Sequence, residues 1–180
     1  DQTTGKLVET QTAFFSPNQP DGTHYDYEVD AQTTATFAHL SWVLTPLWSV
    51  DSGLRIEETR YDYTNRTGDG SACAPSASAC RFYRPASRKD SFADWTGNVA
   101  VSRHTDTTTL YGRLAKGFRV PQATELYRLQ SGQAVAEIDA ETGDSVEFGI
   151  RNHYEHLSYD LSAYLMSKRD VLLQDRDRYT

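Results

Sequence analysis

The sequence predicts an all-β fold, an antiparallel up-and-down sheet of about seven long strands. Polar and apolar residues alternate along most of the 180 residues, which places hydrocarbon on one face of a sheet and polar groups on the other. Tight turns and long polar connections also alternate. The turns are expected at Thr45-Pro46, 104–107 and 154–156, and the long connections at 16–31, 62–91 and 118–143. No shift in composition marks a domain boundary.

Each expected strand is justified by its own alternation. The approximate ranges are 6–15, 36–44, 48–59, 95–102, 110–117, 144–152 and 157–166. In the third range, Leu54 and Ile56 fall on one face, and Arg55 and Glu57 fall on the other. The apolar faces of the other strands after the first are, in order, Ala38, Leu40, Trp42 and Leu44; Trp95, Val99 and Val101; Leu110 and Leu114; Val146, Phe148 and Ile150; Leu157, Leu161 and Leu165. Several ranges reach the ~9–11 residues that a tilted strand needs to cross a bilayer.

Membrane insertion is compatible with this pattern, although the mean hydropathy is only -0.64. No stretch approaches the ~20 consecutive apolar residues of a spanning helix. A spanning strand gives a weaker signal, because only alternate residues face lipid. Short turns on one rim and long loops on the other are the layout of a transmembrane β-barrel, with the short turns on the periplasmic side. The fold class predicted is therefore a segment of such a barrel.

Several function classes are disfavoured. The net charge of -7 and the dispersed Lys and Arg residues argue against binding to nucleic acid. The five histidines form no HExxH motif, and the chain has no GxSxG elbow and no phosphate-binding glycine loop. We therefore predict no catalytic residues, no cofactor and no enzymatic activity. The first ten residues lack the pattern of a signal peptide, so the chain is interpreted as mature protein or as part of a longer one.

Cys73 and Cys80 flank a short stretch rich in small residues. A local disulfide is the favoured interpretation, and it would place this segment in an oxidising compartment. Free thiols or half of a metal site remain alternatives. No second Cys/His pair with zinc spacing accompanies them, so no metal site is predicted.

Two neighbouring segments carry a specific family resemblance. The first contains Gly117, Phe118, Arg119, Pro121, Glu125, Leu126 and Tyr127, and the second contains Glu141, Thr142, Ser145, Glu147, Gly149 and Arg151. They resemble the segments through which one barrel strand leaves the membrane and the next re-enters it in TonB-dependent receptors of bacterial outer membranes. Leu54-Arg55 and the stretch from Ser158 to Val171 are similar to other strands of that family. Val120 and Ala140 depart from its usual Ala and Pro.

The resemblance implies a fold and a function. Such receptors are barrels of about 22 strands with a separate plug domain. Residues 1–180 would then be a partial barrel domain without the plug and without the C-terminal strand. The implied function is energised import of a scarce nutrient, a ferric siderophore above all, across the outer membrane. The implied partners are the TonB–ExbB–ExbD system, acting through the plug, and outer-membrane lipid or lipopolysaccharide.

Candidate site residues fall into two groups. Substrate contacts are expected on extracellular loops, where binding residues concentrate: His24, Tyr25, Tyr27, Arg81, Tyr83, Arg119, Tyr127 and Arg128. Girdle aromatics, and salt bridges within loops or to lipopolysaccharide phosphates, are the alternatives. Lumen-facing charges could guide substrate or contact the plug, or could form a cross-strand ion-pair lattice: Arg55, Glu57, Arg113, Glu147, Arg151 and Asp160.

Two other interpretations of the whole chain stay open. A soluble or secreted all-β binding module could bury its apolar faces against each other in a sandwich. An outer-membrane barrel could also serve as a passive pore or carry an enzymatic function.

Overall fold

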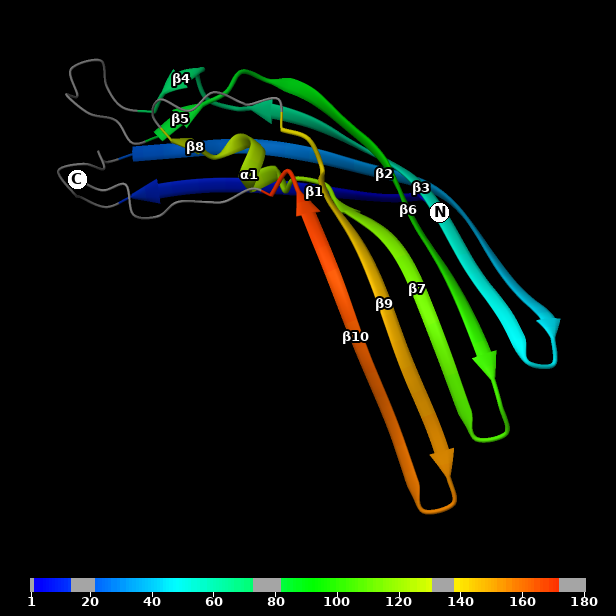
Figure 1. Cartoon of the computed structure of the whole chain (residues 1–180). Helices are drawn as coiled ribbons and strands as arrows, with labels where there is room; N and C mark the ends of the chain where they lie inside the picture. The colour runs from blue at the N-terminus through cyan, green and yellow to red at the C-terminus, as the bar shows by residue number, and fades with distance from the viewer. Residues whose placement is uncertain (1, 14–21, 73–81, 131–137, 172–180) are drawn as a thin grey trace. The chain divides into compact units, whose positions relative to one another are not determined.

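A computed structural model describes residues 2–13, 22–72, 82–130 and 138–171 (Figure 1). Seven strands pair in the order β1-β2-β3-β6-β7-β9-β10, and three short strands form a second sheet in the order β4-β5-β8. The strands of the large sheet are β1 (Gln2–Ala13), β2 (Gly22–Thr45), β3 (Trp48–Asn65), β6 (Arg88–His104), β7 (Thr108–Arg119), β9 (Glu141–Tyr154) and β10 (Leu157–Arg169). The other elements are β4 (Gly70–Ser71), β5 (Phe82–Arg84), β8 (Leu129–Gln130) and the helix α1 (Ala123–Tyr127).

The predicted antiparallel fold, its seven long strands and its three tight turns are confirmed. β2 and β3 are joined through Pro46 and Leu47, β6 and β7 through 105–107, and β9 and β10 through Glu155 and His156. Figure 1 shows these three hairpin turns at the ends of their strand pairs.

The predicted bounds of the long connections are wrong. β2 already begins at Gly22, β3 continues to Asn65, and β6 begins at Arg88. The residues added to the strands include Tyr25, Tyr27 and Val29, which are buried and alternate with acidic side chains. The period-two alternation therefore continues through this part of β2, with two tyrosines and a valine on its buried face.

The loop predicted from Phe118 to Gly143 has narrower bounds and contains a helix. β7 runs on to Arg119, β9 starts at Glu141, and α1 lies between them. Within the described residues, no helix has both the length and the apolar character needed to span a membrane.

The chain divides into two compact units. The first, here the cluster unit, consists of Asp1–Thr34, Glu58–Ala93 and Val120–Asp139. The second, here the hairpin unit, consists of Ala35–Glu57, Asp94–Arg119 and Ala140–Thr180.

The strand register of the hairpin unit separates apolar from charged side chains. Leu114 lies opposite Val99 and Val146, and Val146 lies opposite Leu165. Residues of this kind form the apolar face, whose exposed members include Val99, Val101, Leu110, Leu114, Phe148, Leu161 and Leu165. The other side of the same strands is the polar face, which carries Tyr111, Arg113, Glu147, Arg151 and Asp160. The sheet of this unit is therefore amphipathic, with its hydrocarbon exposed.

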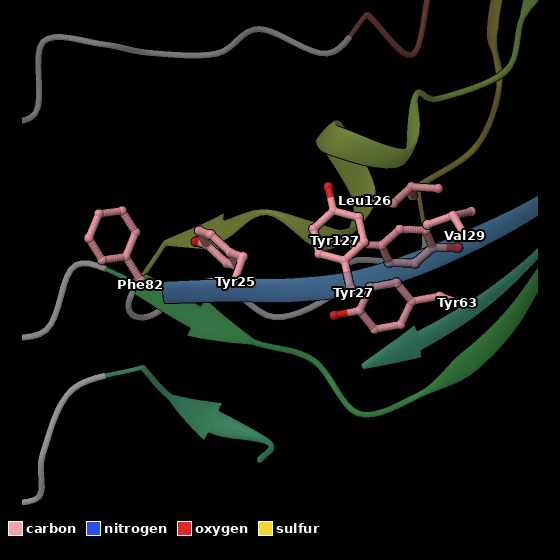
Figure 2. Packing of buried hydrophobic residues seen from close by; sticks show 7 residues of the cluster. All are labelled: Tyr25, Tyr27, Val29, Tyr63, Phe82, Leu126 and Tyr127. Atoms are coloured by element: carbon pink, nitrogen blue, oxygen red, sulfur yellow. The ribbon is translucent and has the colours of Figure 1, made fainter. Parts of the chain in front are cut away.

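The cluster unit has a buried core of its own. Its members come from β2, β3, β5 and α1 and include mostly aromatic side chains (Figure 2). The buried hydrophobic residues of this cluster are Tyr25, Tyr27, Val29, Tyr63, Phe82, Leu126 and Tyr127.

Gly149 is required on the polar face because the ring of Tyr111 lies against it. A Cβ at Gly149 would lie 2.3 Å from Cζ of Tyr111. We predict that Gly149→Ala lowers the free energy of unfolding by roughly 1–3 kcal/mol, since the ring must move away from the added methyl group. Urea unfolding of the purified protein in detergent measures this.

Gly117→Ala is the matched control, because no heavy atom lies within 4 Å of a Cβ built there. Equal stability of the two variants would contradict the predicted clash.

Candidate functional site

The segment after β7 folds onto the core of the cluster unit, and local chemistry explains its helix. Gln122 caps the helix with an extended backbone, and Glu125 accepts a hydrogen bond from the backbone N–H of Gln122 at 2.7 Å. This carboxylate satisfies one of the donors that a helix N-terminus leaves open. The turn closes where the N–H of Arg128 donates to the carbonyl of Thr124 at 3.3 Å. Leu126 and Tyr127 at the end of this short helix are both buried.

Tyr127 anchors this helix to the sheet. Its ring stacks on Tyr63 with centroids 4.2 Å apart, and Tyr63 in turn lies 5.3 Å from Tyr27 (Figure 2). The Tyr127 hydroxyl donates a hydrogen bond of 2.7 Å to Oδ2 of Asp90. Arg88 holds the same carboxylate, with Nη2 2.6 Å from Oδ1. A stacked ring and a charge-assisted hydrogen bond thus fix α1 against β3 and β6.

Tyr25 plays the same role for the residues after α1. Its hydroxyl donates to the carbonyl of Leu129 at 2.6 Å, and its ring meets Phe82 edge-on at 5.7 Å. Phe82 also stacks on His24, with centroids 4.2 Å apart. The guanidinium of Arg128 lies 5.7 Å from the centroid of Tyr25. The residues that follow α1 are therefore tied to β2 through a tyrosine ring.

Burial also keeps two of these phenols protonated. It raises the pKa of Tyr63 to about 12. Burial is likewise the main cause that raises the pKa of Tyr127, and the hydrogen bond to Asp90 adds to it. Both hydroxyls thus stay protonated to a higher pH than an exposed phenol does.

The aromatic residues predicted to bind substrate lie mainly inside this core. Tyr25, Tyr27 and Tyr127 have at most 2% of their surface exposed, and His24 has 1%. They lie in β2 and α1 rather than in loops. Their visible role is to hold the core together, and a contact with substrate stays a prediction. Tyr83, in β5, is the exposed one of the set, at 37%.

One of the basic residues predicted to bind substrate, Arg119 at the end of β7, forms an ion pair. Its Nε lies 3.1 Å from Oε2 of Glu141 at the start of β9. Lys168 holds the other oxygen of Glu141 at 3.0 Å. Arg81, Cys73 and Cys80 lie outside the described residues. Their roles therefore remain predictions.

Four of the six charges predicted to face a lumen share the polar face along β7, β9 and β10. Arg113 lies opposite Glu147, and Arg151 lies opposite Asp160. Arg151 and Asp160 form an ion pair, with Nε 2.8 Å from Oδ2. Arg55 pairs with Glu57 along β3, with Nε 2.8 Å from Oε2. That this face lines a lumen stays a prediction.

Tyr111 connects this polar network. Its hydroxyl donates to Oε1 of Glu147 at 2.8 Å, and the guanidinium of Arg151 lies 4.7 Å from its ring centroid. The ring occupies the space above Gly149 that a side chain would fill. The charged residues of β9 are thus positioned by a tyrosine of β7.

Sequence reasoning missed Tyr63 and Asp90 as partners of Tyr127. Continuing the period-two pattern of β3 past Thr59 would have placed Tyr63 on the same face as Thr59. No sequence signal indicates Asp90, because its contact with Tyr127 joins residues 37 positions apart. In the described part of the chain, no group of three or more His, Cys, Asp or Glu residues is arranged to hold a metal ion.

Comparison with known proteins gives a consistent result. Residues 3–180 match the model of the family described as "TonB dependent receptor-like, beta-barrel". The copper transporter OprC matches 90% of this chain with a TM-score of 0.63 and 19% identity. The ferric yersiniabactin uptake receptor FyuA from Yersinia pestis matches 97% with a TM-score of 0.64 and 20% identity. No curated protein sequence matches.

The chain spans 25% of the length of each of these two structures. At 19% and 20% sequence identity, this structural likeness shows the fold alone.

The hydrogen bond from Tyr127 to Asp90 is predicted to hold α1 in place. Tyr127→Phe keeps the stacked ring and removes this bond, which is worth about 1.5 kcal/mol for a charged acceptor. We expect trypsin to cleave after Arg128 about tenfold faster, because cleavage follows the population of the opened segment. The cleavage rate is measured by mass spectrometry.

Tyr83→Phe is the control, since the Tyr83 hydroxyl makes no hydrogen bond within the described residues. A cleavage rate in Tyr127→Phe that equals the rate in this control would show that the bond does not hold the segment.

The raised pKa of Tyr63 predicts alkaline destabilisation. An unfolded tyrosine ionises near 10, whereas burial raises the pKa of folded Tyr63 to about 12. Between these values the unfolded chain binds fewer protons than the folded one, so stability is complete below about pH 10 and falls as pH rises toward 12. Urea midpoints measured from about pH 8 to 11 should decline at the upper end. Tyr63→Phe should flatten the decline, and an unchanged slope would assign it to other groups.

Proposed function

Because the chain belongs to the TonB-dependent receptor family, we propose that it is part of the barrel of an outer-membrane receptor that imports a scarce nutrient, and that this nutrient is a ferric siderophore. The family match over residues 3–180 is the observation that carries the proposal. FyuA, one of the structural neighbours, is described as a ferric yersiniabactin uptake receptor. The ligand class of the proposal is taken from that description, and copper, which is named for OprC, is the alternative.

The amphipathic hairpin unit supports the membrane part of the proposal. β7, β9 and β10 contain 12, 14 and 13 residues, which exceeds the ~9–11 residues of a tilted spanning strand. Leu165 has 76% and Phe148 has 65% of its surface exposed. Exposed hydrocarbon in water costs about 25 cal/mol per Å², and contact with lipid chains removes this cost. In the proposed barrel the apolar face therefore faces lipid and the polar face lines the lumen.

The lengths of the connections then assign the two ends of the strands to the two sides of the membrane. The turns at Pro46–Leu47, 105–107 and 155–156 are short, as periplasmic turns of such barrels are. The connection between β7 and β9 leaves from the opposite strand ends, which makes it extracellular. Tyr83, Arg119 and Arg128 are the proposed substrate contacts in the extracellular part, and the buried tyrosines support the segment that presents them.

Energy coupling belongs to the same proposal. Import against a gradient would be driven by TonB–ExbB–ExbD acting through a plug domain. A passive pore needs neither the TonB system nor a plug domain. Dependence of uptake on TonB therefore distinguishes the two functions.

The test is uptake and growth of a strain that lacks the gene for the full-length receptor. Under iron limitation we expect loss of growth on one member of a siderophore panel, restored by the wild-type gene. Uptake of that radiolabelled ferric chelate should also stop in a strain without TonB. Persisting uptake without TonB would indicate a passive pore.

Copper is the alternative substrate to test, because OprC is described as a copper transporter. Unchanged growth on all siderophores together with reduced copper accumulation would contradict the iron assignment.

A further inference from the structure

Among the described residues, one guanidinium on the polar face of the hairpin unit has no charged partner. Arg55 pairs with Glu57 and Arg151 pairs with Asp160. Arg119 and Lys168 share Glu141. Arg113 makes no ion pair and no hydrogen bond with its side chain in the part of the chain that the structure describes. An arginine that is not neutralised by its neighbours is available to an external anion.

Arg113 lines an open hollow of about 490 Å³, here the Arg113 hollow. Phe37, Arg55 and Asn98 line it as well, and Gly53 forms part of its wall. A Cβ at Gly53 would lie 3.1 Å from Nδ2 of Asn98, so the missing side chain leaves the space open. The charged residues of the lining are Arg55, Arg113 and Lys116. Glu57 pairs with Arg55 and Asp94 pairs with Lys116, so Arg113 is the lining charge that no described carboxylate pairs with.

Glu147 should neutralise Arg113 but is held elsewhere. The two residues lie directly opposite each other on β7 and β9, where cross-strand side chains are within reach of one another. Glu147 instead accepts the hydrogen bond of Tyr111, whose ring lies against Gly149 and beside the guanidinium of Arg151. Tyr111 thus holds the carboxylate that lies directly opposite Arg113.

We propose that the Arg113 hollow is a subsite for an anionic oxygen group of the imported ligand, such as a carboxylate or a catecholate, and that Tyr111 keeps it available by holding Glu147. The inference rests on the proposed function, because the ligand must pass along the polar face. Arginine suits this role, since its planar donors bind paired oxygens with charge-assisted hydrogen bonds. Tyr111 is a positioning residue here, and Arg113 is the binding residue.

The test uses the purified full-length receptor in detergent and titration calorimetry with three probes. These are a ferric tris-catecholate chelate, which is anionic, a ferric tris-hydroxamate chelate, which is neutral, and inorganic phosphate. Tyr111→Phe keeps the ring and releases Glu147 toward Arg113. We expect its affinity for the anionic probes to fall about tenfold, with the affinity for the neutral chelate unchanged.

A second substitution tests whether the released Glu147 causes this loss of affinity. Glu147→Gln removes the competing charge, so the Tyr111→Phe/Glu147→Gln double variant should recover the wild-type affinity for the anionic probes. A merely structural role of Tyr111 would leave the double variant as weak as the single one, which would overturn the proposal.

Arg113→Gln and Arg103→Gln form a matched pair. Arg103 lies opposite Leu110 on the apolar side of the sheet, so its substitution removes the same charge from the other face. Only Arg113→Gln should abolish the preference for anionic probes, with strand content confirmed by circular dichroism. Equal effects of the two variants, or no binding of any anionic probe by the wild type, would overturn the subsite.

Two further outcomes distinguish a failure of the subsite from a failure of the siderophore assignment. If Arg113→Gln lowers the melting temperature of the receptor and leaves anion binding intact, Arg113 serves a protein carboxylate, and the subsite is overturned. If the wild type binds phosphate through Arg113 but imports no ferric chelate, the subsite stands and the siderophore assignment fails.

Discussion

The antiparallel register between β7 and β9 is the constraint on which the hairpin unit depends. Pairing Leu114 with Val146 and Arg113 with Glu147 sorts hydrocarbon to one face and charge to the other. Because side chains alternate strictly, a slip of one residue would move every member of each set to the wrong face. The apolar face would then be interrupted by charge, and the hydrogen bond from Tyr111 to Glu147 could not form. The amphipathic sheet and the chemistry of its polar face therefore rest on one alignment.

The cluster unit depends on a different kind of contact. Tyr25 and Tyr127 each combine a buried ring with a hydroxyl that donates to a fixed acceptor, Leu129 in one case and Asp90 in the other. These contacts join residues more than 30 positions apart, and they hold the segment that carries the family motif. Leu126 and Tyr127 of that motif act in packing, and Glu125 acts in capping the helix. The most specific part of the sequence is thus a structural anchor, and in the proposed receptor substrate recognition is left to side chains that reach the surface.

Alternation made most of the hairpin unit predictable. Hydrophobic period two located the strands from Leu110 onward, and spacing alone sorted Arg113, Glu147 and Arg151 to one side of the sheet. The same rule also holds for residues 25–30, where Tyr25, Tyr27 and Val29 alternate with acidic residues, so the loop predicted there is part of β2. Spacing in the sequence does not reveal the pairing of glycine and tyrosine. Only the register brings Tyr111 over Gly149.

The sequence by itself determined the all-β class, the two-faced strands, the short turns and the family, because each is written in residues that are neighbours along the chain or spaced by two. The tertiary structure alone decided which candidate residues are buried, as for Tyr27 and Tyr127, and which charge on the polar face of the described residues is left without a partner, as for Arg113. Burial and charge pairing depend on side chains that meet across strands. Those distances are set by the packing of the strands against one another and cannot be read from spacing in the sequence.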